Sequence, residues 1–269
     1  MKPCIVLAAL LLPVASLAAD LPRVASINLC TDQLVLSIAA PEQIASLSWL
    51  SADPNESMLA DEAAGFPLNY GTAEELLQVD AAVVVAGSET SPFTRQMLRR
   101  LGFDVVDISP ANDLDGIARN LTMVGAAIGR AETAAIAIDD MRSRADALER
   151  RAAAPQTAVV VRPGGFTVAR DTLADGLMRL AGLDNAVAEL DRWGSLSVEA
   201  LLTARPDVIV FARYRPEQAS LANRFLAHPA LANVRTATRS VVVDSKYWAC
   251  GVPASLESVA LLLEQLGRF

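Results

Sequence analysis

The side chains best suited to acid–base or metal chemistry are few in this chain. His228 is the only histidine among 269 residues, and Ala227-His228-Pro229-Ala230 predicts a turn. No Ser-His-Asp set can be assembled around it, and the chain has neither a P-loop nor a Gly-x-Gly-x-x-Gly motif. Histidines and carboxylates at metal-coordinating spacing are also missing. Carboxylate chemistry by Asp32 or Glu89 is the remaining catalytic alternative, so we expect a binding protein without a resident metal or cofactor.

Aromatic and polar side chains gather instead at the predicted carboxyl ends of strands, where ligands bind in open α/β sheets. All three tryptophans and all three tyrosines fall there, although only 5% of the residues are aromatic. Such rings bind flat macrocycles and aromatic chelates, and arginines suit carboxylate or phosphate groups. Each aromatic ring could equally pack at the rim of the cleft without contacting the ligand. Asp32 and Glu89 could equally be turn or helix-capping residues. The candidate ligand-binding residues are Asn28, Cys30, Asp32, Trp49, Tyr70, Ser88 and Glu89, then Arg162, Phe166, Trp193, Arg213, Tyr214, Tyr247 and Trp248.

A segment that occurs twice predicts two similar lobes. Residues 74–85 match residues 199–210 at a constant offset, and both copies read as a short amphipathic helix, a turn and a buried strand. One distant repetition suggests paired α/β lobes rather than a solenoid. Each copy begins with an acidic residue, Glu74 or Glu199. These glutamates could contact a partner that has two matching halves. Alternatively, they are first-turn helix residues that interact favourably with the helix dipole.

Strands that alternate with helices predict parallel sheets in both lobes. About four strands are expected in each lobe. The predicted strands cover residues 23–28, 44–49, 82–86 and 104–108, then 157–161, 208–210 and 240–244. Helices are predicted over residues 32–39, capped by Thr31, and over 92–101, 172–181, 217–226 and 253–266.

Residues 114–153 are predicted to be helical almost throughout. Asp113 can cap the first helix and Gly129 breaks it, whereas residues 132–151 contain neither glycine nor proline. A helix of about 20 residues is about 30 Å long, enough to connect two lobes as a stiff strut. The expected division is a targeting segment at 1–19, a first lobe at 20–128, an interlobe helix at 129–154 and a second lobe at 155–269.

Cys30 and Cys250 are both predicted near the cleft between the lobes. A disulfide between them would clamp the lobes together, but it requires Cα atoms within about 4.4–6.8 Å. Two unpaired cysteines and a contact with the ligand remain alternatives.

The first 19 residues have the features of a cleaved secretory signal. Lys2 precedes an apolar stretch at residues 5–12, and Ser16-Leu17-Ala18-Ala19 forms a small-residue cleavage site. Cys4 precedes that stretch, so we expect a free periplasmic protein and no lipoprotein. The formal net charge of −8 argues against a nucleic-acid partner.

The chain resembles the periplasmic solute-binding proteins of ABC importers for cobalamin, haem and ferric siderophores. The resemblance covers residues 23–266 and rests on the opening Arg-Val-x-Ser-Ile-Asn, the twin Glu-x-Leu-Leu units and the long middle helix. It also rests on Trp193-Gly194-x-Leu-Ser-x-Glu199 and Tyr247-Trp248 before the last helix. The first repeat departs from the family pattern, because Ala81-Ala82 replaces the usual Pro-Asp.

The resemblance implies two lobes joined by one rigid helix, with a ligand cleft between them. It further implies that Glu74 and Glu199 dock to arginine pockets on the two halves of an ABC permease, which works with an ATPase. The implied cargo is a metal chelate, with cobalamin-like corrinoids ranked first, ferric siderophores second and haem third. Binding proteins of this family usually act as monomers. The alternatives are a secreted enzyme that modifies a tetrapyrrole or chelate on the same fold, and a sensor or scavenger that meets no permease.

Overall fold

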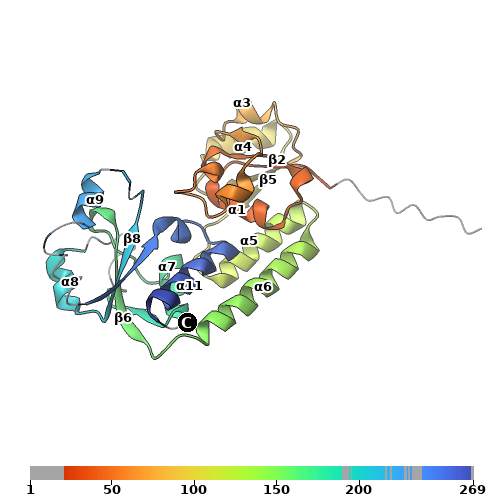
Figure 1. Cartoon of the computed structure of the whole chain (residues 1–269). Helices are drawn as coiled ribbons and strands as arrows, with labels where there is room; N and C mark the ends of the chain where they lie inside the picture. Colours follow the sequence, from red (N-terminus) through yellow and green to blue (C-terminus); the bar gives the residue numbers. More distant parts are fainter. Residues whose placement is uncertain are drawn as a thin grey trace, which may run out of the picture.

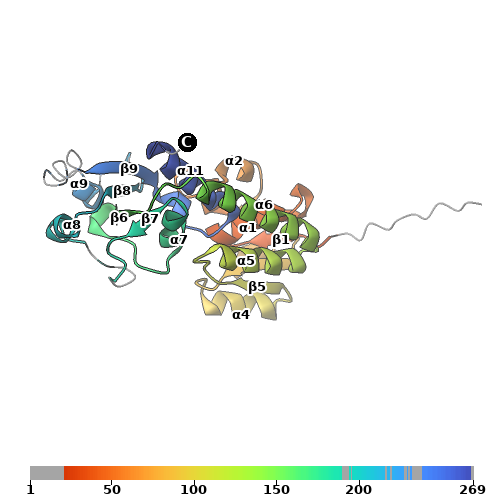
Figure 2. The ribbon, with the colours of Figure 1, turned by 90° about the horizontal axis from the view of Figure 1, so that it is seen from below.

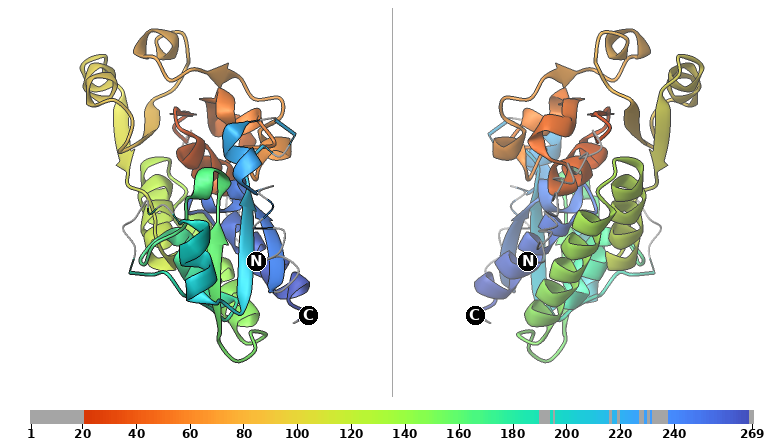
Figure 3. Two further views of the ribbon diagram at one scale, coloured as in Figure 1. Left: turned by 90° about the vertical axis from the view of Figure 1, so that its left-hand side faces the viewer. Right: turned by 90° about the vertical axis from the view of Figure 1, so that its right-hand side faces the viewer.

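The computed structural model describes residues 21–189, 194, 196–215, 217, 218, 220–226, 229, 231 and 238–267. Within this part of the chain, two parallel sheets form two lobes, and helix α6 (Ala131–Glu149) lies between them in the sequence. Figure 3 shows the first lobe, in orange to yellow, standing above the strands of the second lobe. The predicted two-lobed α/β fold is confirmed.

The first lobe has a five-stranded parallel sheet in the order β3-β2-β1-β4-β5. Its strands are β1 (Val24–Ser26), β2 (Ile44–Ser48), β3 (Leu68–Asn69), β4 (Val83–Gly87) and β5 (Asp104–Ile108). Its helices are α1 (Leu29–Ile38), α2 (Ala60–Ala63), α3 (Ala73–Leu76), α4 (Pro92–Arg100) and α5 (Leu114–Ala127), and 3₁₀ turns are η1 (Pro41–Gln43) and η2 (Trp49–Ala52).

The second lobe has a sheet in the order β7-β6-β8-β9, again with every described pair parallel. Its strands are β6 (Gln156–Val161), β7 (Leu183–Asn185), β8 (Val208–Arg213) and β9 (Arg239–Asp244). Its helices are α7 (Leu173–Leu180), α8 (Val198–Ala204), α9 (Leu221–Leu226) and α11 (Leu256–Gln265). Its 3₁₀ turns are η3 (Pro163–Gly165), η4 (Ser245–Trp248) and η5 (Pro253–Ser255).

The two copies of the repeated segment occupy equivalent places. Strand β4 lies between β1 and β5, and β8 lies between β6 and β9. Both strands are rich in β-branched residues and buried on both faces, as central parallel strands require. The preceding helices, α3 and α8, are capped by the hydroxyls of Thr72 and Ser197. The segment that is repeated in the sequence therefore forms the same helix–strand unit in both lobes.

A single buried apolar cluster runs through both lobes. It joins one face of each sheet to α1, α5, α6, α7 and α11, whereas the opposite faces have smaller cores of their own. Helix α6 lies beside α5 and runs from beneath the first lobe to the second (Figures 1 and 2). The lobes thus share a core on the helical side.

Most expected boundaries agree with the structure, but the helix predicted over 217–226 begins at Leu221, and strand β7 was not predicted. Asp113 caps α5 and Gly129 interrupts the helical segment at a φ of 71°, as predicted. The predicted start of the first helix is wrong, because α1 begins at Leu29 and the side chain of Asn28, not Thr31, accepts from the Cys30 amide. The first lobe has five strands instead of four, since the two-residue β3 was not predicted.

Candidate functional site

A cavity of about 550 Å³ lies between the lobes, at the carboxyl ends of strands from both sheets. The first lobe contributes residues that follow β1, β4 and β5, and the second contributes residues that follow β6 and β9. This volume is typical of small-molecule sites. The lining residues are Asn28, Cys30, Thr31, Leu34, Gly87, Ser88, Glu89, Ile108, Ser109, Pro110, Ala111, Asn112 and Asn120, with Arg162, Thr167, Val168, Thr172, Leu173, Ala174, Ser245, Trp248, Ala249 and Gly251.

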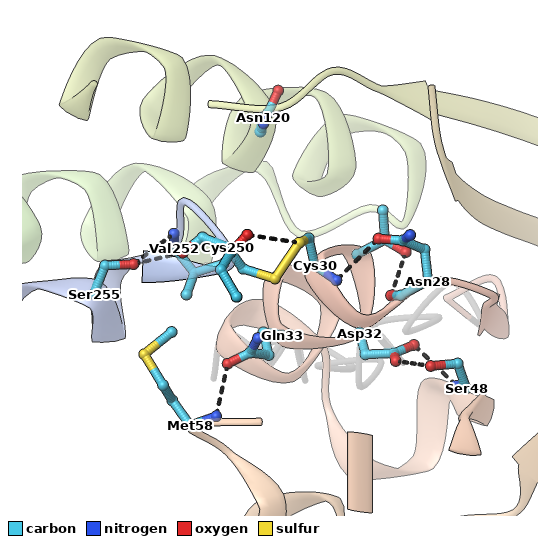
Figure 4. Close-up of a disulfide and its surroundings, with 12 residues drawn as sticks. Asn28, Cys30, Asp32, Gln33, Ser48, Met58, Asn120, Cys250, Val252 and Ser255 are labelled. Carbon is cyan, nitrogen blue, oxygen red and sulfur yellow. Dashed lines mark hydrogen bonds between the residues drawn. A yellow bond between two sulfur atoms is a disulfide. The ribbon is translucent and has the colours of Figure 1, made fainter. Parts of the chain in front are cut away.

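A disulfide forms part of this wall. Cys30, in the first turn of α1, is bonded to Cys250, which is 220 residues later, and their Cα atoms are 5.0 Å apart (Figure 4). The Ser255 hydroxyl donates to the Cys250 carbonyl over 2.7 Å and accepts from the Val252 amide, which holds the loop that carries Cys250. The disulfide links the first lobe to the second directly at the cavity.

The lobes also meet closely at Gly251. A Cβ added to Gly251 would lie 2.7 Å from the Cβ of Ala111 and 2.8 Å from its carbonyl oxygen. Ala111 belongs to the segment between β5 and α5, so the two backbones approach each other across the boundary between the lobes. Only glycine fits such an approach without displacing a neighbour.

The second-lobe wall contains hydrogen-bonding groups that the protein leaves unpaired. Arg162 follows β6 and makes no ion pair with any residue that the structure describes. Burial of its guanidinium lowers its pKa below the ordinary arginine value. Thr167 Oγ1, Ser245 Oγ and Trp248 Nε1 are buried without a hydrogen-bond partner in the described structure. Buried polar groups are normally paired, so these atoms indicate a place for ligand atoms.

The first-lobe wall is polar but largely paired within itself. Asn28 Oδ1 accepts from the Cys30 amide over 3.0 Å, and the Ser88 amide donates to the Ile108 carbonyl over 2.7 Å. Glu89 is exposed and is the sole acidic residue among the described residues of the cavity wall. Six of the predicted ligand residues therefore line the cavity: Asn28, Cys30, Ser88, Glu89, Arg162 and Trp248.

Asp32 has a different position. Its side chain is fully buried, accepts from the Ser48 amide over 3.0 Å and from the Ser48 hydroxyl, and points away from the disulfide (Figure 4). Burial raises the pKa of this carboxyl to about 6, and hydrogen bonds from Ser26 and Ser48 oppose the shift. Asp32 therefore links α1 to the end of β2 through its hydrogen bonds with Ser48. It does not line the cavity, contrary to the prediction that it contacts the ligand.

The other predicted ligand residues lie outside the cavity wall. The exposed rings of Trp49 and Tyr70 pack against each other with centroids 6.2 Å apart. Arg213 pairs with Asp244 in its own lobe. Phe166, Tyr214 and Tyr247 are likewise absent from the wall, while Trp193 and His228 lie outside the described residues.

A polar contact closes another part of the boundary between the lobes. Arg215 donates to Asp53 Oδ2 over 2.5 Å and to Glu56 Oε1 over 2.8 Å, and Tyr214 donates to the same Glu56 oxygen over 2.7 Å. Lys246 donates to the Pro54 carbonyl over 2.9 Å. We call residues 53–56 with 214, 215 and 246 the interlobe latch.

Some residues of these sites were not predicted from the sequence. Ser245 directly follows β9, so a stricter use of the strand-end rule would have found it. Thr167 lies beyond a glycine-rich turn, and no sequence feature indicates its role. Asp53, Glu56 and Arg215 form a contact between loops 159 or more residues apart, which no local pattern reveals.

The repeated glutamates occupy matching positions on the surface. Glu74 is the second residue of α3, Glu199 is the second residue of α8, and both are exposed. Each helix precedes a central strand of its sheet and runs back toward it. The two glutamates therefore stand at equivalent positions in the two lobes.

Nowhere in the described ranges do three or more His, Cys, Asp or Glu side chains form a group suited to a metal ion. None of the described helices is both long enough and apolar enough to span a bilayer.

Comparisons with known proteins place this geometry among binding proteins. Residues 24–245 match the model of a family described as periplasmic binding protein. No curated protein sequence matches the chain. Among solved structures, the periplasmic haem-binding protein HutB of Vibrio cholerae is 18% identical, with a TM-score of 0.77, covering 91% of this chain and 98% of that one.

Two further structures have similar folds. The periplasmic vitamin B12 binding protein BtuF of Vibrio cholerae is 19% identical, with a TM-score of 0.68 and coverage of 92% and 97%. An ABC-type Fe3+-hydroxamate transport system from Saccharomonospora viridis is 18% identical, with a TM-score of 0.67 and coverage of 92% and 93%. At these identities the likeness concerns the fold alone.

Proposed function

This chain belongs to the periplasmic binding protein family, and on that premise we propose that it is the substrate-binding subunit of an ABC importer. It captures a metal chelate between its lobes and delivers it to a permease. The observation that carries this proposal is the cavity, because both lobes line it and its second-lobe wall holds unpaired donors.

The chelate is a corrinoid such as cobalamin, or a ferric siderophore, with haem as a third class. Trp248 in the wall supports a flat or macrocyclic ligand, since an indole ring offers a large apolar face. The metal arrives inside the organic chelate. The protein binds and does not transform this ligand.

Delivery depends on the paired glutamates. A two-lobed protein has to contact two permease halves at once, and two equivalent contacts add avidity and fix the orientation. Carboxylates pair with arginines in a directional, bidentate manner. Glu74 and Glu199 are exposed at equivalent positions, which suits that role. We further propose a monomer that is exported by residues 1–19 and released unlipidated into the periplasm.

A binding titration tests the proposed function. The chain from residue 20 onward is titrated with cyanocobalamin, haemin and ferric siderophores, followed by visible absorption and calorimetry. Saturable one-to-one binding of one class at micromolar affinity or tighter is the expected result. Failure of every class to bind would contradict chelate capture.

A further inference from the structure

Among the described residues of the second-lobe wall, Arg162 is the single charged group, and it has no acidic partner in that wall. Arg162 and Glu89 are the charged side chains among the described residues of the wall. They form no ion pair with each other, and Glu89 is exposed whereas Arg162 is partly buried. An arginine remains protonated even where burial opposes its charge. Its burial without an acidic partner is unfavourable unless a ligand supplies the negative charge.

Three neutral groups of the same wall also lack acceptors. Thr167 is 1% exposed and Ser245 is 8% exposed, and neither hydroxyl has a partner in the described structure. Trp248 Nε1 is buried, unpaired and able only to donate. Such groups cost free energy when they stay unsatisfied. Together with Arg162 they give this wall four groups that can donate to acceptor atoms of a ligand, and for Arg162 and Trp248 Nε1 donation is the one possible role.

The topology divides these donors into two pairs. Arg162 and Thr167 lie on the segment after β6, and Ser245 and Trp248 lie on the segment after β9. Strand β8 separates β6 from β9, so the pairs are two strand spacings apart. Neighbouring strands are about 4.8 Å apart, so the ends of β6 and β9, which these two segments follow, are roughly 10 Å from each other.

We propose that the ligand carries an acid group held by Arg162 and Thr167, and a second hydrogen-bond acceptor, roughly 10 Å away, held by Ser245 and Trp248. The acid group is a carboxylate or a phosphate, since both match the planar guanidinium. The ligand lies across the carboxyl edge of the second sheet, from β6 to β9. This inference rests on the proposed function, and it specifies the chemistry of the chelate.

Matched ligand pairs test the acid group on the wild-type protein. Each pair contrasts a compound that carries acid groups with one that lacks them: haemin and haemin dimethyl ester, which share one macrocycle, cyanocobalamin and dicyanocobinamide, which lacks the nucleotide loop with its phosphate, and ferric citrate and neutral ferric tris(acetohydroxamate). For the class that binds, the acidic member is expected to bind at least about tenfold more tightly, because a charge-assisted hydrogen bond is lost with the neutral member. This comparison needs no variant, so it does not depend on the folding of a mutant.

Variants then assign the preference to Arg162. Arg162→Gln is expected to abolish the tenfold preference, and Arg162→Lys to retain part of it. The control is Arg170→Gln in the same lobe, where the arginine is exposed and pairs with Glu189; it should leave the preference unchanged. Ser245→Ala is expected to weaken both members of the pair alike.

The outcomes separate this inference from the proposed function. Equal binding of both members by wild type, or a full preference retained by Arg162→Gln, would overturn the acid subsite while chelate capture stands. Unchanged binding by Ser245→Ala would overturn the second acceptor. No binding of any of the six compounds would overturn chelate capture, and this inference with it.

Discussion

The guanidinium of Arg215 donates to the carboxylate of Glu56 over 2.8 Å, across the boundary between the lobes. The same guanidinium also reaches Asp53, and all three side chains are about one-fifth exposed. The shared core joins the lobes on the helical side, the disulfide joins them at the cavity, and this contact joins them at the interlobe latch. The cavity lies at this same boundary and is lined by residues of both lobes.

The first prediction concerns the interlobe latch. Arg215→Ala removes the ion pairs to Asp53 and Glu56, so the loop at residues 53–57 should open more often. The amides of Glu56 and Ser57, which donate to the Asp53 carbonyl, are expected to exchange hydrogen up to about fivefold faster. The matched control is Arg213→Ala, which removes a pair within the second lobe. Equal exchange in the two variants would mean that the latch does not hold the loop.

The second prediction concerns the disulfide. Cys30→Ser with Cys250→Ser removes a link between residues 220 apart, and it should lower the free energy of unfolding by about 2–5 kcal/mol. Urea unfolding with and without reductant measures this loss in the chain from residue 20 onward. Without reductant that chain should react with no alkylating agent, and after reduction it should take up two alkyl groups. An unfolding midpoint that reductant leaves unchanged would refute the contribution to stability.

The third prediction concerns Asp32. Burial raises its pKa to about 6 from an ordinary value of 3.8. Between these values the folded chain holds a proton that the unfolded chain releases, so this group favours folding as the pH falls through the window and opposes it as the pH rises. The difference in unfolding free energy between wild type and Asp32→Asn should change by about 3 kcal/mol from about pH 3.5 to pH 7.

Urea unfolding at a series of pH values measures that difference directly. Asp61→Asn, at an exposed position of the same lobe, is measured over the same pH series as the control. Parallel curves for wild type and Asp32→Asn would show that the Asp32 pKa is not raised.

The fourth prediction concerns the close approach of the lobes at Gly251. Gly251→Ala places a Cβ within 3.0 Å of two Ala111 atoms, one of them a backbone oxygen, so the lobes have to shift apart. The expected cost is about 1–3 kcal/mol of unfolding free energy. Gly176→Ala in α7 is the control, because its added Cβ lies 3.6 Å from its nearest neighbour, Asn112 O. A loss of the same size in both variants would argue against a specific contact at Gly251.

The sequence predicts the central elements of this fold better than its edges. Val83–Gly87 and Val208–Arg213 are β-branched, buried runs that follow repeated helices, so their type and equivalence can be read directly. Strand β3 has two residues, too few for any periodicity. The start of α1 was misplaced because Thr31 and Asn28 are both good caps, and only the observed bond to the Cys30 amide distinguishes them.

The sequence predicts that the site lies at the carboxyl edges of the two sheets, but it does not predict which residues at those edges line the cavity. The strand-end rule places Asn28, Ser88, Arg162 and Trp248 in the cavity wall, but it treats all strand ends alike. Tyr214 also follows a strand, yet it contacts Glu56 and belongs to the interlobe latch. Which strand ends meet a cavity, and which meet the other lobe, depends on side-chain pairs far apart in the sequence.

The most direct test of the proposed function measures binding and uptake together for the glutamate pair. Glu74→Ala with Glu199→Ala should bind the chelate with wild-type affinity, because neither residue lines the cavity. Uptake in cells that lack the native chain should fall below about one-tenth of the wild-type level, since both docking contacts are lost. Glu62→Ala with Glu149→Ala, at two exposed positions outside the repeats, should support normal uptake. Normal uptake by the Glu74 and Glu199 double variant would contradict delivery through these residues.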